Sequence, residues 1–209
     1  MRTRPALSVL LLLAAAACGD RAVSLACQPT ASGTDLTSRA SPYDSAMIMI
    51  GDRHAQVCYS RPSVKGRVIF GGLEPYDSLW RTGANEPTII HLGFDAEIAG
   101  LAVPAGSYSL YAVPSRTQWQ VVINRSTSQW GITRDAPNPQ GGMYRSAYTA
   151  EVAAQEVGRA PVPADSVDLV EQFTIRAEPG SGDAATLLLE WERTRVRIPI
   201  RATSPGARD

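Results

Sequence analysis

The sequence predicts an all-β protein, a single antiparallel β-sandwich or jelly-roll-like domain behind a signal peptide. Three observations support this fold class. Short apolar segments with period-two alternation recur along the chain, and Gly or Pro interrupts them about every ten residues. No stretch after the N-terminal segment has a long helical period, and 17 Gly and 15 Pro disfavour a helical bundle. Many short strands can each bury one face when two sheets pack together.

The first 17 residues have the layout of an export signal, since Arg2 and Arg4 precede an apolar run from Ala6 to Ala17 in which Ser8 is the only polar residue. The run has 12 residues, whereas a helix needs about 20 to cross a bilayer, so we expect cleavage. Small residues directly before Cys18 resemble the bacterial lipobox, which predicts that Cys18 becomes the lipidated first residue. The alternative is cleavage at the same small residues to give a free secreted protein.

The chain is predicted to have four segments. Residues 1–17 form the signal peptide, residues 18–41 a flexible tether without periodicity, residues 42–203 the sandwich and residues 204–209 a disordered tail. We expect a cell-envelope location, with the membrane contacted through the lipid anchor only. Gly19, rather than Asp, follows the predicted lipidated cysteine, which favours the outer membrane in an organism that has one.

The charge balance argues against a nucleic-acid partner. Without Arg2 and Arg4, 18 basic residues face 20 acidic ones, and no basic block is present. Binding to phosphates depends on clustered positive charge. We therefore expect an unknown small ligand or an envelope protein as the partner.

The strands follow in order after the tether, each a period-two or short apolar run that ends near a turn residue. The expected strands are AMIMIG (46–51), HAQVCYS (54–60), RVIFG (67–71), TIIHLGF (88–94), SYSLYAV (107–113), QWQVVIN (118–124), AYTAEVAAQEV (147–157), VEQFTIRAE (170–178), ATLLLEWE (185–192) and RVRIPI (195–200). The last alternates best, with Val196, Ile198 and Ile200 on one face and arginines on the other. Pro199 predicts that this strand lies at a sheet edge.

The two cysteines left after lipidation of Cys18 are Cys27 and Cys58. Export takes them to a compartment that permits disulfides. The sequence leaves open whether they pair or whether Cys27 is a bystander in the tether.

Residues 80–91 contain more charged and polar side chains than a turn between strands needs. Arg81, Asn85, Glu86 and His91 lie close together in sequence, and Arg61 ends a nearby strand. In one interpretation Arg81 binds Glu86 or Glu74 and staples the loops. In the other, Arg61, Arg81, Asn85, Glu86 and His91 line a pocket for an anionic or sugar-like ligand, with the arginines holding the negative charge.

No hydrolase elbow, paired-histidine zinc motif, phosphate loop or dinucleotide fingerprint is present in the sequence. We therefore predict no catalytic residues and no required cofactor, and a non-enzymatic binding or scaffolding module.

The alternative is a metal-dependent or redox protein with a site around His91, Cys58 and Glu86, to which His54 could contribute. His54 and Cys58 are four residues apart in one strand, which separates them by about 13 Å. They cannot both bind one ion directly, so a shared site would need one of them and a residue from a neighbouring strand.

Four motifs in one order carry a resemblance to a known family. They are YSRPSVKGRVIFG (59–71), WRTGANEPTIIHL (80–92), VPAGSYSLYAVP (103–114) and WQVVINRSTSQWG (119–131). Their combination resembles a family of exported bacterial proteins that is known only as a domain of unknown function. The resemblance implies a single β-rich exported domain and brings no catalytic residues. The matching residues are Tyr59, Arg61, Pro62, Gly66, Arg67, Trp80, Arg81, Gly83, Asn85, Pro104, Gly106, Tyr108, Trp119 and Asn124.

Overall fold

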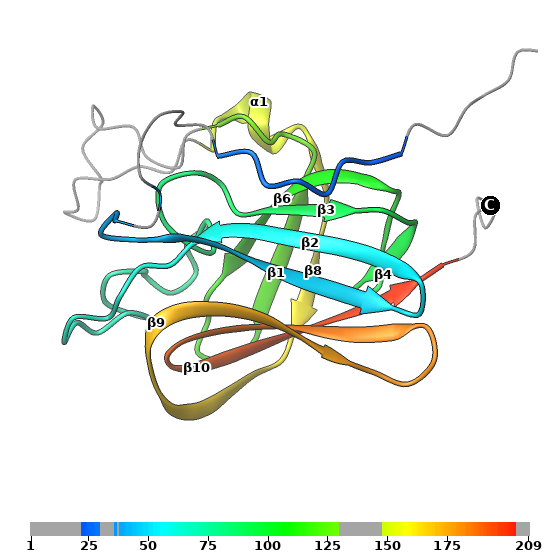
Figure 1. The fold of residues 1–209 in the computed structure, drawn as a ribbon. Coiled ribbons are helices and arrows are strands. Elements are labelled where there is room, and N and C mark those ends of the chain that lie inside the picture. Colours follow the sequence, from blue (N-terminus) through cyan, green and yellow to red (C-terminus); the bar gives the residue numbers. More distant parts are fainter. Residues whose placement is uncertain (1–21, 30–35, 37, 130–147, 204–209) are drawn as a thin grey trace, which may run out of the picture.

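The computed structural model describes residues 22–29, 36, 38–129 and 148–203, which form two packed antiparallel sheets (Figure 1). The all-β sandwich predicted from the sequence is confirmed, and one short helix, α1 (Ala150–Ala153), accompanies the strands in the described part of the chain. The signal peptide predicted for residues 1–17, lipidated Cys18 and the tail predicted for residues 204–209 lie outside the described residues.

The larger sheet has six strands in the order β1 (Tyr43–Ile50), β2 (Arg53–Ser60), β3 (Ile89–Leu92), β6 (Gly106–Val113), β7 (Trp119–Asn124) and β8 (Glu156–Val162). The smaller sheet has the order β5 (Leu101–Val103), β4 (Ala96–Ile98), β10 (Ala184–Ala202) and β9 (Ala164–Pro179). Strands β9 and β10 form a long hairpin below the larger sheet in Figure 1.

The alternation of side chains along each strand decides which of them enter the core between the sheets. In β2, Ala55, Val57 and Tyr59 are at most 1% exposed, whereas His54 on the opposite face is exposed. The hydroxyl of Tyr59 accepts a hydrogen bond from the amide of Ile175 at 2.9 Å, which links the two sheets.

Aromatic rings fill one end of the core. Ring centroids of neighbouring members lie 4.7 to 6.3 Å apart, mostly edge to face, an arrangement that the quadrupoles of the rings favour. The cluster consists of Phe70, Trp80, Trp119, Phe173 and Trp191. The cluster therefore joins the segment between β2 and β3, which contains Phe70 and Trp80, to strands of both sheets.

Several of the predicted strands differ from the structure. The predicted strands 185–192 and 195–200 form one continuous strand, β10, and β4 and β5 were not predicted. Residues 67–71 form turns, because Gly72 and Glu74 both donate backbone hydrogen bonds to the carbonyl of Ile69. Their apolar side chains, Ile69 and Phe70, still pack into the core. The segment 147–157 divides into α1, which Thr149 caps by accepting from the amide of Val152, and the start of β8.

The prediction that Pro199 marks an edge strand was wrong, since β10 lies between β4 and β9. Pairing with β9 ends at Val196, and pairing with β4 begins at Ile200. Pro199 lies between these two stretches, where its missing N–H interrupts neither ladder. A proline is therefore tolerated at this point of an internal strand.

Residues 22–29, which we call the strap, lie across the outer face of the larger sheet, and a disulfide joins Cys27 to Cys58 in β2. The Cα atoms of the two cysteines are 5.6 Å apart. The tether predicted for residues 18–41 therefore includes a segment that is fixed to the domain. Local sequence did not indicate this, because the strap is held by a covalent partner 31 residues away.

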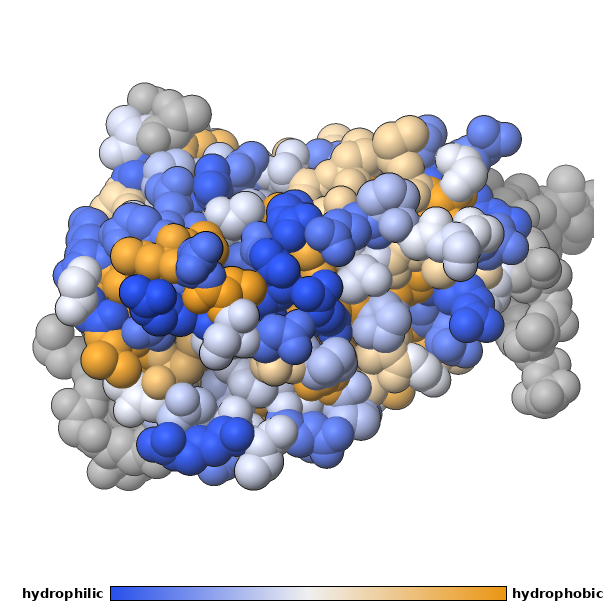
Figure 2. Space-filling model, turned by 90° about the horizontal axis from the view of Figure 1, so that it is seen from below, coloured by the Kyte–Doolittle hydropathy of each residue, from blue (hydrophilic) through white to orange (hydrophobic). Residues whose placement is uncertain are grey.

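The surface over the smaller sheet is mainly hydrophilic, with small groups of hydrophobic residues between the polar ones (Figure 2). Arginines of β10 bind acidic neighbours there. Arg197 forms an ion pair with Asp165 at 2.6 Å. No helix among the described residues is both long enough and apolar enough to cross a membrane.

Candidate functional site

The five residues predicted to line a pocket are distributed over several parts of the fold. Arg61 serves as a clamp: its Nε donates to the carbonyl of Phe173 at 3.1 Å, and its Nη2 donates to Thr174 at 3.0 Å. Its remaining nitrogen lies 3.1 Å from the carboxylate of Asp44. Arg61 therefore links the larger sheet to β9, and Asp44 balances its positive charge.

Glu86 is paired with Arg39 rather than with Arg81. One guanidinium nitrogen of Arg39 lies 2.8 and 3.0 Å from the two carboxylate oxygens, and the hydroxyl of Ser60 donates to Glu86 at 3.4 Å. The side chains of Arg39 and Glu86 are 14% and 3% exposed. Such a buried carboxylate needs this partner to offset the loss of solvation.

The loop from Trp80 to Thr88 is built mainly from structural interactions. The hydroxyl of Thr82 donates to the carbonyl of Leu110 at 2.8 Å, and the hydroxyl of Thr88 donates to the carbonyl of Thr82 at 2.6 Å. Asn85 has a φ of 59°, a left-handed conformation that Asn adopts more readily than most residues. Trp80 is buried in the aromatic cluster. The polar and aromatic side chains of this segment therefore stabilise the conformation of the loop.

The charges of Arg81 and Glu74 are close enough for each to affect the pKa of the other. Burial lowers the pKa of Arg81, and the nearby charge of Glu74 opposes the shift. Burial raises the pKa of Glu74 to about 7, and the charges of Arg81 and Arg67 only partly counter it. In the described part of the chain, neither carboxylate lies within ion-pair distance of Arg81, so the predicted staple to Glu86 or Glu74 is not formed.

The residues proposed as metal ligands do not form a ligand set. Cys58 is bonded to Cys27, so its sulfur is no thiolate donor. His91 binds Ser107 through Nδ1 at 2.8 Å, whereas His54 is exposed at the start of β2. No three His, Cys, Asp or Glu side chains of the described residues are grouped so that they could share an ion.

Two of the cavities in the described structure are not lined by Arg61, Arg81, Asn85 or Glu86. The first, about 630 Å³ in volume, opens between the turn that connects β6 to β7 and the start of β9. We call it the arginine cleft. Its lining consists of Phe70, Tyr76, Ser115, Arg116, Thr117, Gln118, Trp119, Pro161, Val162, Pro163, Ala164, Asp165, Ser166 and Thr194. Its volume is typical of small-molecule sites.

Arg116 is the distinctive residue of this cleft. Its guanidinium carbon lies 4.6 Å from the centre of the Tyr76 ring, a cation–π contact. The segment with Tyr76 is fixed beside this turn, because Asp77 donates a backbone hydrogen bond to the carbonyl of Pro114 at 2.8 Å. Gly71 lies against the same ring, where a Cβ atom would be 2.4 Å from a ring carbon.

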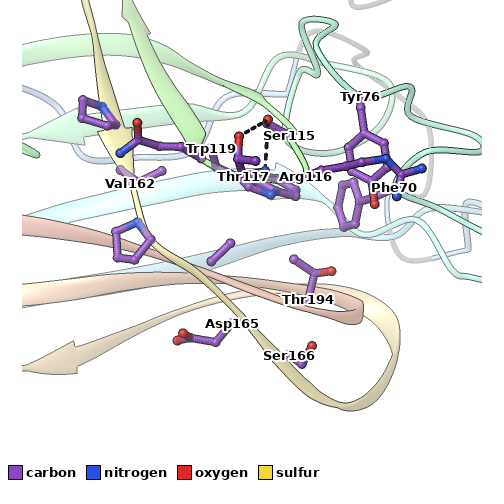
Figure 3. A pocket seen from close by; sticks show the side chains of 14 residues that line it. Phe70, Tyr76, Ser115, Arg116, Thr117, Trp119, Val162, Asp165, Ser166 and Thr194 are labelled. Atoms are coloured by element: carbon purple, nitrogen blue, oxygen red, sulfur yellow. Dashed lines mark hydrogen bonds between the residues drawn. The ribbon is translucent and has the colours of Figure 1, made fainter.

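The two walls of the arginine cleft differ in chemistry (Figure 3). Tyr76, Arg116 and Thr117 lie on one side, and Asp165, Ser166 and Thr194 lie on the other. Arg116 is exposed and has no carboxylate within 4 Å among the described residues, while the charge of Asp165 is matched by Arg197 outside the cleft. The cleft therefore presents one unmatched positive charge and several hydroxyl groups.

The second cavity, about 360 Å³ in volume, lies between the strap and the larger sheet. We call it the strap cavity. Its lining consists of Ser24, Ala26, Gln28, Tyr43, Ile89, His91, Ser107 and Thr127. Of the five pocket residues predicted from sequence, only His91 lines it. Burial lowers the pKa of His91, which favours the neutral form of the imidazole at pH 7.

A comparison with protein families matches residues 41–200 to the family described as protein of unknown function (DUF2911). The chain belongs to this family. The resemblance to an uncharacterised family, inferred from four sequence motifs, is thereby confirmed. Neither the curated proteins nor the solved structures include a match to this DUF2911 protein.

The motif residues of this DUF2911 protein lie mainly in its framework. Tyr59, Trp80 and Trp119 are buried in the core, and Arg61 links the sheets. Arg116, outside those matching residues, was missed by the sequence analysis. Arg116 lies in the turn PSRTQW (114–119) between two correctly predicted strands. This position could have indicated a binding residue, since loops on a rigid scaffold often hold such residues.

Proposed function

We propose that this protein is a lipid-anchored binding module of the cell envelope that holds an anionic, hydroxyl-bearing ligand, such as an acidic saccharide, in the arginine cleft. The observation that carries the proposal is the exposed guanidinium of Arg116, which is stacked on Tyr76 and has no carboxylate partner among the described residues. The export pattern before Cys18 supports the location.

The stacking of Arg116 favours a carboxylate as the charged group of the ligand. A guanidinium presents a planar fork of donors that matches the two oxygens of a carboxylate. Contact with the Tyr76 ring restricts the motion of this fork before the ligand arrives. Less conformational entropy is then lost on binding.

The opposite wall suits the hydroxyl groups of a saccharide. Ser166 and Thr194 are paired across β9 and β10, and both line the cleft. Their hydroxyls can each donate and accept hydrogen bonds. Because Arg197 binds Asp165 at 2.6 Å, the repulsion between Asp165 and an anionic ligand is reduced.

The test compares trigalacturonate with galactotriose, which lacks its carboxylates, by isothermal titration calorimetry on the domain from Gly19 onward with the disulfide intact. We expect trigalacturonate to bind more tightly, and its affinity to fall with salt because Arg116 is exposed. Arg116→Ala should weaken binding at least tenfold, which corresponds to about 1.4 kcal/mol.

Two further variants separate the stacked fork from charge alone. Arg116→Lys keeps the charge but loses the planar fork, so it should restore only part of the affinity. Arg201→Ala removes an exposed arginine of β10 outside the cleft and should leave binding unchanged. Equal binding of both trisaccharides, or equal losses in Arg116→Ala and Arg201→Ala, would contradict the proposal.

A further inference from the structure

The strap is an extended segment whose contact with the sheet depends on side chains. Val23, Leu25, Cys27 and Pro29 are partly buried, whereas the three residues between them are exposed. This alternation places one row of side chains against the larger sheet. No backbone hydrogen bond between the strap and the sheet is present in the described structure.

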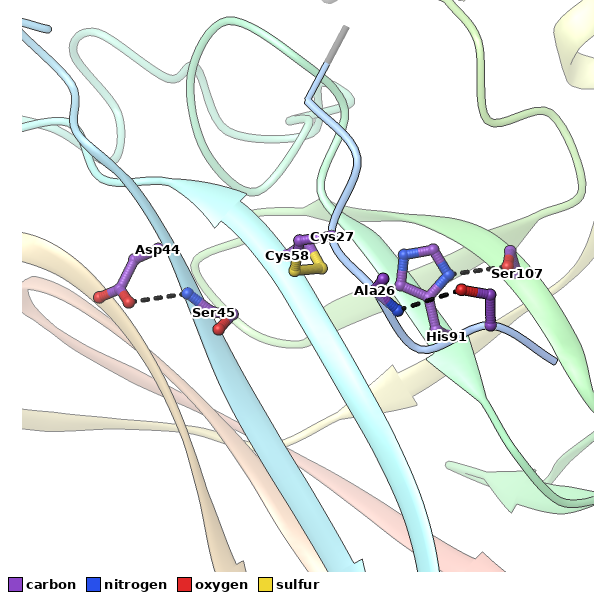
Figure 4. The surroundings of a disulfide bond; sticks show 8 residues. Ala26, Cys27, Asp44, Ser45, Cys58, His91 and Ser107 are labelled. Atoms are coloured by element: carbon purple, nitrogen blue, oxygen red, sulfur yellow. Dashed lines mark hydrogen bonds between the residues drawn. A yellow bond between two sulfur atoms is a disulfide. The ribbon is translucent and has the colours of Figure 1, made fainter. Parts of the chain in front are cut away.

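The disulfide is the covalent link that holds the strap to the sheet. Cys58 is completely buried on the outer face of β2, and Ser45 and Ile89 are its neighbours on β1 and β3. Figure 4 shows the strap passing over this face, with Ala26 between the disulfide and His91. Without the bond, only the contacts of Val23, Leu25 and Pro29 would oppose the entropy of a released chain.

The strap contributes Ser24, Ala26 and Gln28 to the lining of the strap cavity, and these residues belong to its exposed row rather than to the row packed against the sheet. The sheet contributes the other polar groups. His91 and Ser107 are hydrogen-bonded to each other at 2.8 Å from neighbouring strands, β3 and β6. Release of the strap would therefore remove three of the residues that enclose the cavity.

The polar groups of the cavity are uncharged at neutral pH. Burial, followed by the negative charge of Glu86, raises the pKa of Tyr43 to about 12, so its hydroxyl keeps its proton. Burial favours the neutral form of His91, and the remaining polar groups are the hydroxyls of Ser24, Ser107 and Thr127 and the amide of Gln28. A charged ligand would lose solvation there without gaining an ionic partner from the lining.

We propose that the strap cavity is a second binding site, that it takes an uncharged, hydroxyl-rich ligand of monosaccharide size, and that it exists only while the Cys27–Cys58 disulfide holds the strap in place. Hydroxyl and amide groups that both donate and accept match a ligand whose hydroxyls do the same. A volume of about 360 Å³ lies at the lower end of the range for small-molecule sites.

The site is independent of the arginine cleft, with which it shares no lining residue. The two sites also differ in the ligand charge they prefer, since the arginine cleft suits an anion and the strap cavity an uncharged ligand. Failure of one proposal therefore leaves the other open to its own test.

The experiment measures binding of glucose, galactose, mannose and N-acetylglucosamine by saturation-transfer NMR and calorimetry, with glucuronate as the charged comparison. In the Arg116→Ala chain, whose arginine cleft has lost its positive charge, we expect at least one neutral sugar to bind at least tenfold more tightly than glucuronate. The double variant Cys27→Ser/Cys58→Ser should lose this binding at least tenfold, as should the unchanged chain after reduction by dithiothreitol.

A second pair of variants keeps the disulfide intact. Gln28→Ala and Ser107→Ala, on opposite walls, should each weaken binding severalfold, whereas Arg201→Ala, outside both cavities, should have no effect. Circular dichroism checks that every variant retains its β structure. Absence of binding by all four neutral sugars would overturn the proposal, and so would undiminished binding by the folded chain without its disulfide.

Discussion

Glu74 gives a pH-dependent stability that can be calculated from its surroundings. Burial raises its pKa from 4.5 to about 7. Below pH 4.5 the carboxyl is mainly protonated in the folded and unfolded states, so it contributes no difference. As the pH rises from 4.5 to 7, the unfolded state releases its proton while the folded state retains it, and the folded state loses stability. Above pH 7 the loss is complete and constant.

The size of this loss follows from the shift of the pKa. Each unit corresponds to about 1.4 kcal/mol, so the full loss is at most about 3 kcal/mol. Glu74→Gln keeps the shape but cannot ionise. We expect this variant to match the wild type near pH 4 and to exceed its free energy of unfolding by about 2 to 3 kcal/mol at pH 8.

Urea unfolding at pH 4, 5, 6, 7 and 8 measures this difference. Glu97→Gln, which changes an exposed carboxylate in β4, is the matched control and should give a nearly constant difference. If Glu74→Gln were less stable than the wild type at pH 8, Arg81 would hold Glu74 as a stabilising carboxylate. That result would refute the reasoning from burial.

Three further predictions concern the framework, and urea unfolding at pH 7 measures each. Replacing Cys27 and Cys58 by Ser opens a loop with a sequence separation of 31 and should cost about 3 to 4 kcal/mol; an unchanged free energy would mean that the strap is not bonded in solution. Glu86→Ala leaves the guanidinium of Arg39 without its buried partner and should cost about 3 kcal/mol, and a loss below 1 kcal/mol would contradict a buried pair. Tyr59→Phe removes the hydroxyl bound to Ile175 and should cost about 1 to 3 kcal/mol, and a variant as stable as the wild type would contradict a stabilising role of this bond.

Much of the sandwich was predictable because strand formation depends on local alternation. In segment 54–60, the sequence assigns Ala55, Val57 and Tyr59 to one face, and the structure buries these residues in the core. Predictions from the local pattern were wrong where apolar residues serve tertiary packing rather than strand formation. Ile69 and Phe70 are apolar because their loop covers the core, although the same pattern is typical of a strand.

The candidate site was less predictable than the fold. The sequence analysis expected an arginine to bind an anion, but it selected Arg61 and Arg81 from neighbouring motifs. Arg61 is satisfied by Asp44 and by acceptors of β9, while Arg116 lies over Tyr76, forty positions earlier in the chain. An arginine is available for a ligand only if the fold leaves it without a carboxylate, and local spacing does not determine that.

The sequence by itself determined the fold class, most strands and, in segments such as 54–60 and 195–200, the face that enters the core, because these depend on the period of apolar residues. The tertiary structure alone decided which distant groups meet: Cys27 with Cys58, Arg39 with Glu86, and the two walls of the arginine cleft. Strand order and register bring these groups within bonding distance. They result from the packing of the whole core, to which residues from every part of the domain contribute.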